Sequence, residues 1–192
     1  MTSEKSATYH RLITAAAACF SEKGFNATSV SDIARRAAVS QGAMYTYFKG
    51  KGELITAIVM EEQHTALQNY TLSYQCSPFE RICQLMKSCI NEVGYPADHR
   101  LWVEIIAESS RNQTVRETFI LTDKIMRDGI KSIISAGIAR GDFAGDLDLE
   151  ASTIALFALI DGLIARKAIN TDFNLERDMP GFNRLVEKIL VV

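Results

Sequence analysis

Proline occurs only three times in this chain of 192 residues, and glycine eleven times. Because proline interrupts helices and glycine weakens them, this scarcity leaves long stretches that favour helices over an all-β fold. Apolar residues recur at intervals of three and four along most of the chain, which is the helical period. The sequence therefore predicts an all-α protein of about nine helices.

Three short helices are expected at the N-terminus. The first covers residues 9–22, with Gly24 as its C-terminal stop. Thr28 stands where the N-cap of a second helix of about ten residues belongs. Ser40 caps a third helix over 41–48, and a long helix begins near Lys51. Further helices are expected over 78–93, 101–111, 114–139 and 149–169, and a last one from Pro180.

Two short helices joined by a tight turn form a helix-turn-helix pattern. The second helix of that motif enters the major groove of DNA, with its N-terminal residues at the base edges. Ser40 to Ala43 are small or hydrogen-bonding there, and Gln41 can pair with adenine or guanine. Gly42 has no side chain, so the start of this helix can approach DNA closely. The pattern predicts base contacts from Ser40, Gln41, Gly42 and Ala43.

Residues 27–54 carry a more specific signal. Gly42, Tyr45, Tyr47, Phe48, Lys51 and Leu54 follow a Gly-x-x-Tyr-x-Tyr-Phe-x-x-Lys-x-x-Leu spacing, with Thr-Ser-Val-x-x-Ile-Ala upstream. With the preceding Phe-Ser-Glu-Lys-Gly-Phe, residues 6–66 closely resemble the DNA-binding domain of tetracycline-repressor (TetR) type regulators. The resemblance implies phosphate contacts from Thr28, Tyr45, Tyr47 and Lys51. Tyr45 and Tyr47 also fit a role as core aromatics, although their spacing allows burial of only one.

Two positions depart from that family pattern. Gly50 stands where the family often has a capping Ser or Asn, and Gly52 where an acidic residue is common. Both weaken the start of the long helix, by about 1 kcal/mol each. Charge supports a DNA-binding head, since residues 1–54 hold seven Lys or Arg against four Asp or Glu, and the remainder 14 against 19. A difference in net charge of this size between two segments also arises by chance when the segments are short.

The rest of the chain shows no catalytic motif. Glycine-rich phosphate loops, nucleophile elbows and His-Glu-x-x-His are all missing from the sequence. Glu104 and Glu108 share a helix face, so they could hold a metal or do acid–base work. Pairing with Arg100 or Arg111, or exposure to solvent, explains them equally well. Residues 102–112 and the later Leu-Ile-Asp-Gly-Leu are similar to the regulatory domains of one TetR subgroup.

That resemblance implies a head over 1–54 and a helical ligand-binding and dimerisation domain over 55–192. It implies a small-molecule pocket, for which the expected lining is Phe79, Cys83, Met86, Trp102, Ile105, Glu108, Phe119, Met126, Phe157 and Asp161. It also implies a dimer interface made by the last two helices, for which the expected residues are Leu156, Ile160, Leu163, Phe182, Leu185 and Ile189. Each apolar member of these sets fits plain core packing as well.

Four cysteines and three histidines are scattered without metal-ligand spacing, so neither a metal nor another cofactor is expected. We interpret the cysteines as small buried hydrophobic residues. The alternative is a thiol sensor centred on Cys83. The start of the chain has no signal-peptide pattern and no apolar run reaches membrane-spanning length, which predicts a cytoplasmic protein.

These observations predict a homodimeric regulator, a repressor rather than an enzyme. It binds a palindromic double-stranded DNA operator and is released by a small-molecule effector. One rival interpretation is a helical ligand-binding or enzyme-like protein whose DNA-binding head does not function. Another is a protein that acts on other proteins.

Overall fold

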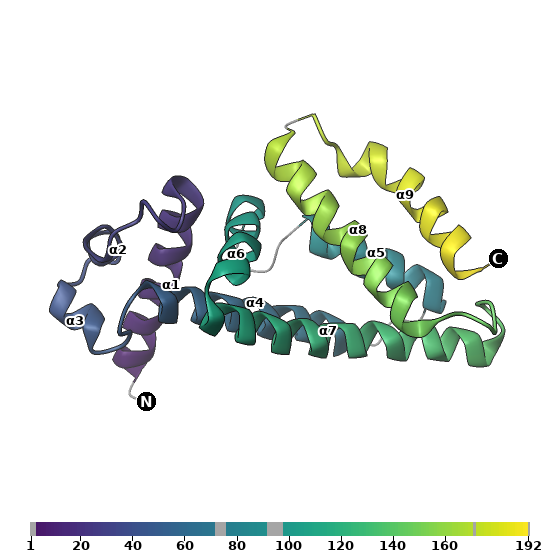
Figure 1. The fold of residues 1–192 in the computed structure, drawn as a ribbon, viewed down its shortest axis with the longest axis horizontal. Coiled ribbons are helices and arrows are strands. Elements are labelled where there is room, and N and C mark those ends of the chain that lie inside the picture. The colour runs from purple at the N-terminus through teal and green to yellow at the C-terminus, as the bar shows by residue number, and fades with distance from the viewer. Residues whose placement is uncertain (1–2, 72–75, 92–97, 171, 192) are drawn as a thin grey trace. The chain divides into compact units, whose positions relative to one another are not determined.

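A computed structural model describes residues 3–71, 76–91, 98–170 and 172–191. Within these ranges the chain forms helices and no strand (Figure 1). The first four helices are α1 (Ser3–Lys23), α2 (Val30–Arg36), α3 (Gln41–Tyr45) and α4 (Lys51–Thr71). They are followed by α5 (Pro78–Asn91), α6 (His99–Arg111), α7 (Gln113–Arg140), α8 (Leu149–Ile169) and α9 (Leu175–Leu190). The expected all-α fold is confirmed.

Two compact units divide the chain. The first contains residues 1–64 and 94–122, and the second contains residues 65–93 and 123–192. The first unit therefore holds the predicted head together with the start of α4, all of α6 and the start of α7. Two long helices, α4 and α7, each begin in the first unit and end in the second.

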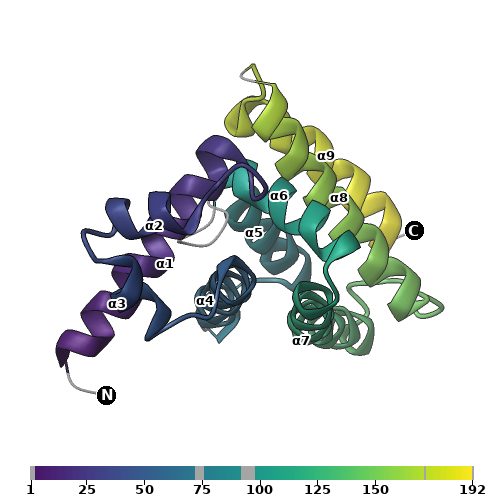
Figure 2. The same cartoon turned by 60° about the vertical axis from the view of Figure 1, so that its left-hand side comes forward.

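The first unit has a core built from α1, α2, α3, α4 and α6. Leu12 and Phe20 from α1, Ile33 from α2, Met44 from α3 and Leu54 from α4 are completely buried. Figure 2 shows α2 and α3 beside α1, in agreement with the contacts that α1 makes with α2 and α2 with α3. Burial of such apolar side chains is the main favourable contribution to folding of this small head.

The second unit has its own core, in which α5 packs against α8 and α9. Its fully or almost fully buried side chains include Ile82, Met86, Leu156, Val186 and Leu190. Helices α8 and α9 follow one another and lie side by side in both views (Figures 1 and 2). Each unit therefore buries an apolar core of its own.

Glycine ends two helices, at Gly24 as expected and at Gly141. Gly24 after α1 and Gly141 after α7 both have positive φ angles, of 80° and 76°. Only glycine adopts this conformation without a steric penalty, so both positions act as helix stops. The predicted start of the last helix at Pro180 is wrong, because α9 begins five residues earlier. The Asn174 side chain caps it by accepting from the Arg177 N–H, and Pro180 lies inside the helix.

Candidate nucleic-acid interface

Helix α2 is fixed by a reciprocal cap at Ser29, not at Thr28 as predicted. The Ser29 hydroxyl accepts the Asp32 N–H at 3.1 Å, and the Asp32 carboxylate accepts the Ser29 N–H at 3.1 Å. Hydrogen bonds from the Ser29 side chain and backbone, with a smaller contribution from Lys23, hold the pKa of Asp32 well below its usual range. A charged Asp32 therefore anchors the start of α2.

The turn between α2 and α3 is short and held by the backbone. Ala38 has a φ of 54°, and the Val39 N–H donates to the Ala34 carbonyl at 3.0 Å. Ser40 then caps α3 as predicted, because its hydroxyl accepts the Ala43 N–H at 3.0 Å. The chain thus builds the helix-turn-helix expected from the sequence.

Helix α3 is anchored by one face and exposed on the other. Met44 is completely buried, whereas Gln41, Gly42 and Tyr45 are exposed. A Cβ placed on Gly42 would meet only the Ser40 hydroxyl, at 3.9 Å. A side chain at Gly42 would therefore not clash with the neighbouring residues. Glycine at this position agrees instead with a close approach of the helix to a binding partner.

Two tyrosines extend this exposed surface beyond α3. Tyr45 retains 53% of its exposure, and Tyr47 is half-buried. Phe48 is the aromatic residue of this segment that enters the core, where its ring stacks on Tyr9 at a centroid distance of 5.1 Å. Neither tyrosine is therefore a buried core aromatic, and both phenol groups agree with the predicted phosphate role.

The Thr28 side chain, for which a phosphate contact was predicted, is buried inside the first unit. Its side chain is 2% exposed, and its hydroxyl donates to the carbonyl oxygens of Cys19 and Gly24, at 3.0 and 2.8 Å. The Thr28 hydroxyl thus ties the end of α1 to the beginning of the helix-turn-helix. Its contact with a phosphate stays a prediction.

The ammonium group of Lys51, for which a phosphate contact was also predicted, makes contacts within the first unit. Its ammonium group donates to the carbonyl oxygens of Phe25 and Thr28, at 2.6 and 2.7 Å, and more weakly to that of Asn26 at 3.3 Å. The same nitrogen lies 4.7 Å from the centroid of the Phe25 ring. These contacts occupy the donors of the ammonium group. Lys51 therefore fastens the start of α4 to the loop between α1 and α2, and its contact with a phosphate stays a prediction.

Most other cations of the head are paired at its surface. Arg35 donates to Asp32 at 2.5 Å, and Arg36 donates to Glu22 at 2.7 Å. The exposed ammonium of Lys49 lies 3.8 Å from Glu53, whose carboxylate also accepts the Lys49 N–H at 2.7 Å. That bond ties the residue before Gly50 to the first turn of α4, which begins at Lys51 although glycine occupies positions 50 and 52.

Helix α6 is tied to the head by two acidic residues, Glu104, which the sequence singled out for another role, and Asp98, which it did not. The Glu104 carboxylate accepts the Phe25 N–H at 2.9 Å. It also lies next to Gly24, where a Cβ would come within 3.5 Å of its Oε1. Asp98 caps α6 by accepting the Leu101 N–H, and its other oxygen accepts the Ser21 hydroxyl at 2.5 Å. Since Phe25 also carries the Lys51 contact, one loop joins α1, α4 and α6.

The ten predicted pocket residues are divided between the two units. Glu108 is buried, but it accepts hydrogen bonds from Arg111 and Asn112 at 2.7 and 3.2 Å, which agrees with the pairing alternative for this residue. Met86 and Ile105 are buried core residues. The first unit holds Trp102, Ile105, Glu108 and Phe119, and the second holds Phe79, Cys83, Met86, Met126, Phe157 and Asp161. That they form one pocket remains a prediction.

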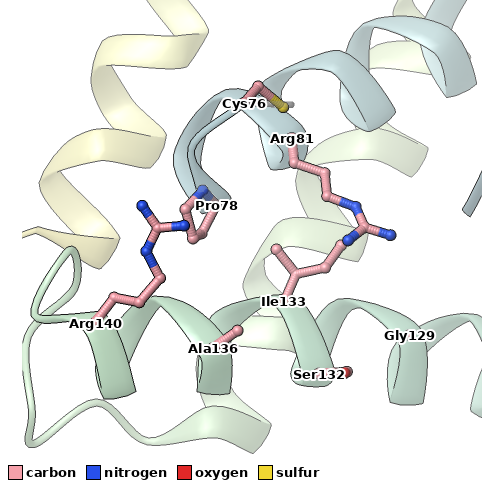
Figure 3. Close-up of a pocket in the computed structure, with 8 residues that line it drawn as sticks. All are labelled: Cys76, Pro78, Arg81, Gly129, Ser132, Ile133, Ala136 and Arg140. Atoms are coloured by element: carbon pink, nitrogen blue, oxygen red, sulfur yellow. The ribbon is translucent and has the colours of Figure 1, made fainter. Parts of the chain in front are cut away.

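Two cavities lie within the second unit, and none of those ten residues lines either of them. One of about 430 Å³ lies between the start of α5 and the end of α7 (Figure 3). Its lining is Cys76, Pro78, Arg81, Gly129, Ser132, Ile133, Ala136 and Arg140. The other, of about 630 Å³, is a more open hollow beside the start of α9 that is lined by Phe173, Arg177, Asp178, Pro180, Gly181, Phe182 and Arg184.

The six predicted dimer residues separate into two groups. Leu156, Ile160 and Leu163 on α8 are at most 8% exposed, so they belong to the core of the second unit, as the alternative interpretation allowed. Leu185 and Ile189 on α9 are 52% and 38% exposed, and Phe182 is half-buried. The outer face of α8 carries apolar or small residues instead: Ile154, Ala155, Ala158, Gly162 and Ala165.

The Cys83 thiol is protonated near neutral pH. Burial, with smaller contributions from Glu187 and Glu80, raises the pKa of Cys83 to about 11. Within the described ranges, His, Cys, Asp and Glu side chains form no cluster of three that could hold a metal ion. None of the helices, over the same residues, is long and apolar enough to cross a membrane.

Two family profiles match the chain. The one described as "Bacterial regulatory proteins, tetR family" matches residues 12–58, and the one described as "BetI-type transcriptional repressor, C-terminal" matches residues 80–187. The second match alone covers more than half of the chain. The chain belongs to the TetR family of transcriptional regulators. Its predicted resemblance to that family is confirmed, and it is a ligand-responsive regulator that binds DNA.

Relatives of this TetR-family regulator are themselves transcriptional regulators. It is 30% identical, over 173 residues, to the HTH-type transcriptional regulator TtgR of Pseudomonas putida, covering 85% of this chain and 81% of TtgR. UidR of Escherichia coli is 28% identical, with 86% and 84% covered. The solved structure of Salmonella enterica GusR is 25% identical, covers 95% of both chains and has a TM-score of 0.80.

A further solved structure shares the fold alone. FadR from Bacillus subtilis, in complex with stearoyl-CoA, is 21% identical, with a TM-score of 0.79 and coverage of 94% of this chain and 98% of that one. Both solved structures match nearly the whole chain. The helical architecture of the family therefore extends over both units.

Proposed function

We propose that this regulator is a repressor that binds a palindromic operator as a homodimer and is released when a small molecule binds the second unit. The observation that carries the proposal is the two-sided character of α3. Met44 fixes the helix in the core, while Gln41, Gly42 and Tyr45 remain exposed. Such a surface fits the floor of the major groove.

Phosphate contacts in this proposal come from Tyr45, Tyr47 and the surface cations, not from Thr28 or Lys51. Gln41 is the residue with the reach and the donor–acceptor pair to distinguish bases. Ser40 and Ala43 place the start of the helix against the groove. One such short helix reads too few bases for a specific site, so two copies are required.

The second copy is expected to pack on the outer faces of α8 and α9. Ile154 on α8 and Leu185 and Ile189 on α9 are exposed apolar side chains. The small residues Ala158 and Gly162 let another helix approach α8 closely. Leu156, Ile160 and Leu163 are left out of this proposed interface because they are buried inside one chain.

Release requires that ligand binding favour one of two arrangements of the heads. Helices α4 and α7 each run from one unit into the other. Lys51 at the start of α4 and Glu104 on α6 both bind the loop between α1 and α2. A ligand that fits the second unit better in one arrangement shifts that population and so changes the spacing of the two heads. No step of this mechanism needs catalysis, and we propose that the protein is not an enzyme.

The test measures fluorescence anisotropy of the DNA just upstream of the protein's own gene, at two salt concentrations. We expect affinity at or below about 10 nM that falls steeply with salt and exceeds the affinity for scrambled DNA by at least about 1,000-fold. Gln41→Ala should weaken binding about tenfold. Gln113→Ala is the matched control, because Gln113 is likewise exposed and begins a helix.

If Gln41→Ala binds the upstream DNA as tightly as Gln113→Ala, the proposed role of α3 is wrong. If neither the upstream DNA nor any genomic fragment selected by the protein binds better than scrambled DNA, the rival with a non-functional head is favoured. For the dimer, Leu185→Lys should shift the sedimenting species toward monomer. Leu121→Lys, at a residue that is 60% exposed on α7, should leave the dimer intact.

A further inference from the structure

The cavity between α5 and α7 carries two guanidinium groups from opposite sides (Figure 3). Arg81 reaches from α5 toward α7, near Ile133, and Arg140 reaches from α7 toward α5, beside Pro78. The two groups thus place positive charge at both ends of one hollow. Guanidinium groups bind carboxylates and phosphates through paired hydrogen bonds.

The surface between the two arginines is small and largely apolar. Gly129, Ser132 and Ala136 follow one another along α7, and with Pro78 and the buried Ile133 they line the hollow. Its volume of about 430 Å³ is within the range of small-molecule sites. Among the residues that line the hollow, Ser132 alone has a side-chain oxygen, and its hydroxyl can donate to an anion.

Two acidic residues near this hollow, Glu80 and Asp142, have partners within the chain. Glu80 caps the start of α5, where its carboxylate accepts the Ser77 N–H and the Ser77 hydroxyl, both at 2.9 Å. Asp142 lies 2.9 Å from Nε of Arg140. The terminal nitrogens of Arg140 are directed toward Pro78, on the side of the hollow (Figure 3). An anion bound there would therefore compete only in part with Asp142.

We propose that this cavity is an effector site for a small amphipathic anion, with its carboxylate or phosphate held between Arg81 and Arg140 and its apolar part on Ile133 and Pro78. The effector role rests on the proposed function, whereas binding of the anion does not. The arrangement selects against cations, because both arginines repel them, and against neutral molecules, which form no charge-assisted hydrogen bonds in which both partners are ionised.

The first experiment is calorimetric titration of the full chain without DNA. The probes are octanoate, octyl phosphate, octylamine and octanol, which share one apolar chain and differ in the head group. We expect octanoate or octyl phosphate to bind at least tenfold more tightly than octylamine and octanol, and the stronger of the two shows whether the head is a carboxylate or a phosphate. Equal binding of octanol and both anions would overturn the proposal.

Four variants locate the site. Arg81→Gln and Arg140→Gln should each weaken binding of the anion at least tenfold, and Arg81→Lys should recover part of the loss. Asp142→Asn should strengthen binding, since it removes the carboxylate that lies 2.9 Å from Nε of Arg140. Lys124→Gln is the matched control on α7, because it removes one exposed positive charge outside the cavity. Unchanged affinity in both arginine variants would overturn the site.

Cys76 supplies a reporter that needs no substitution, because its half-buried thiol lines the cavity. Saturating octanoate, or octyl phosphate if it binds more tightly, should slow alkylation of Cys76 by iodoacetamide and leave Cys89 unaffected. Equal labelling of Cys76 with and without the anion would place the binding elsewhere and refute the site. Anion binding without release of operator DNA would refute the effector role alone, whereas failure of DNA binding without any ligand would refute the proposed function.

Discussion

Replacing Lys51 by methionine distinguishes a structural tie from a phosphate contact. The substitution keeps most of the apolar stem and removes the ammonium group, which donates to Phe25 and Thr28 at 2.6 and 2.7 Å. A hydrogen bond to a charged group contributes about 1.5–3 kcal/mol, but water can rehydrate part of the carbonyls that are left. We therefore expect Lys51→Met to lower the free energy of unfolding of the first unit by about 2–3 kcal/mol.

Urea unfolding followed by circular dichroism measures this loss. The matched control is Lys49→Met, two residues earlier, where the side chain is 91% exposed and lies 3.8 Å from Glu53. Because surface ion pairs of this kind contribute little, the control should change the stability by less than about 0.5 kcal/mol. A Lys51→Met protein as stable as the control would contradict the structural role.

The salt dependence of DNA binding supplies a second, independent comparison. Loss of one phosphate contact per chain lowers the slope of log K against log salt by about 0.9, or by about 1.8 in a dimer. Because Lys51 faces the protein, Lys51→Met should weaken DNA binding only through the smaller folded population and leave the slope unchanged. A slope reduced by about 2, with unfolding unaffected, would restore the phosphate contact implied by the sequence.

Three further predictions concern packing and ionisation. Gly137→Ala would place a Cβ 2.2 Å from the Phe143 ring, and this overpacking should cost about 1–3 kcal/mol in thermal or urea unfolding; an unchanged melting temperature would show that Phe143 moves freely. The lowered pKa of Asp32 in the fold means that its contribution to stability is complete above the pKa of the unfolded chain, near 4, and is lost as pH falls further. Asp32→Asn should therefore flatten the acid limb of a stability–pH profile, and an unaltered limb would contradict the cap. Because burial raises the pKa of Cys83 to about 11, its alkylation should be slow at pH 8 and accelerate toward pH 11; rapid labelling at pH 7 would revive the thiol-sensor alternative.

Periodicity and helix stops predicted the architecture because they are local. Gly24 ends its helix as expected, and the bounds of α8, Leu149–Ile169, match the prediction. Ser29 was missed because Thr28 and Ser29 are both good caps. Only the geometry of the loop decides which hydroxyl reaches the N–H of Asp32 and which turns inward.

Side-chain roles were harder to predict where a contact joins distant parts of the sequence. The contact of Lys51 with DNA was an expectation from the resemblance to TetR-type regulators, and no local pattern in this sequence tests it. The carbonyls that bind Lys51 belong to a loop 23 to 26 residues away. Leu156 was assigned to the dimer because periodicity identifies an apolar stripe but not which stripe faces the second unit's own core.

The central claim, that the exposed face of α3 reads DNA, is tested most directly by Gly42→Ala. A methyl group there meets nothing in the protein closer than 3.9 Å, so the melting temperature should stay the same or rise. In a close-packed interface the same methyl costs about 1–3 kcal/mol, so affinity for the operator should fall about tenfold or more. A stable Gly42→Ala protein that binds the operator as tightly as the unchanged chain would contradict the account.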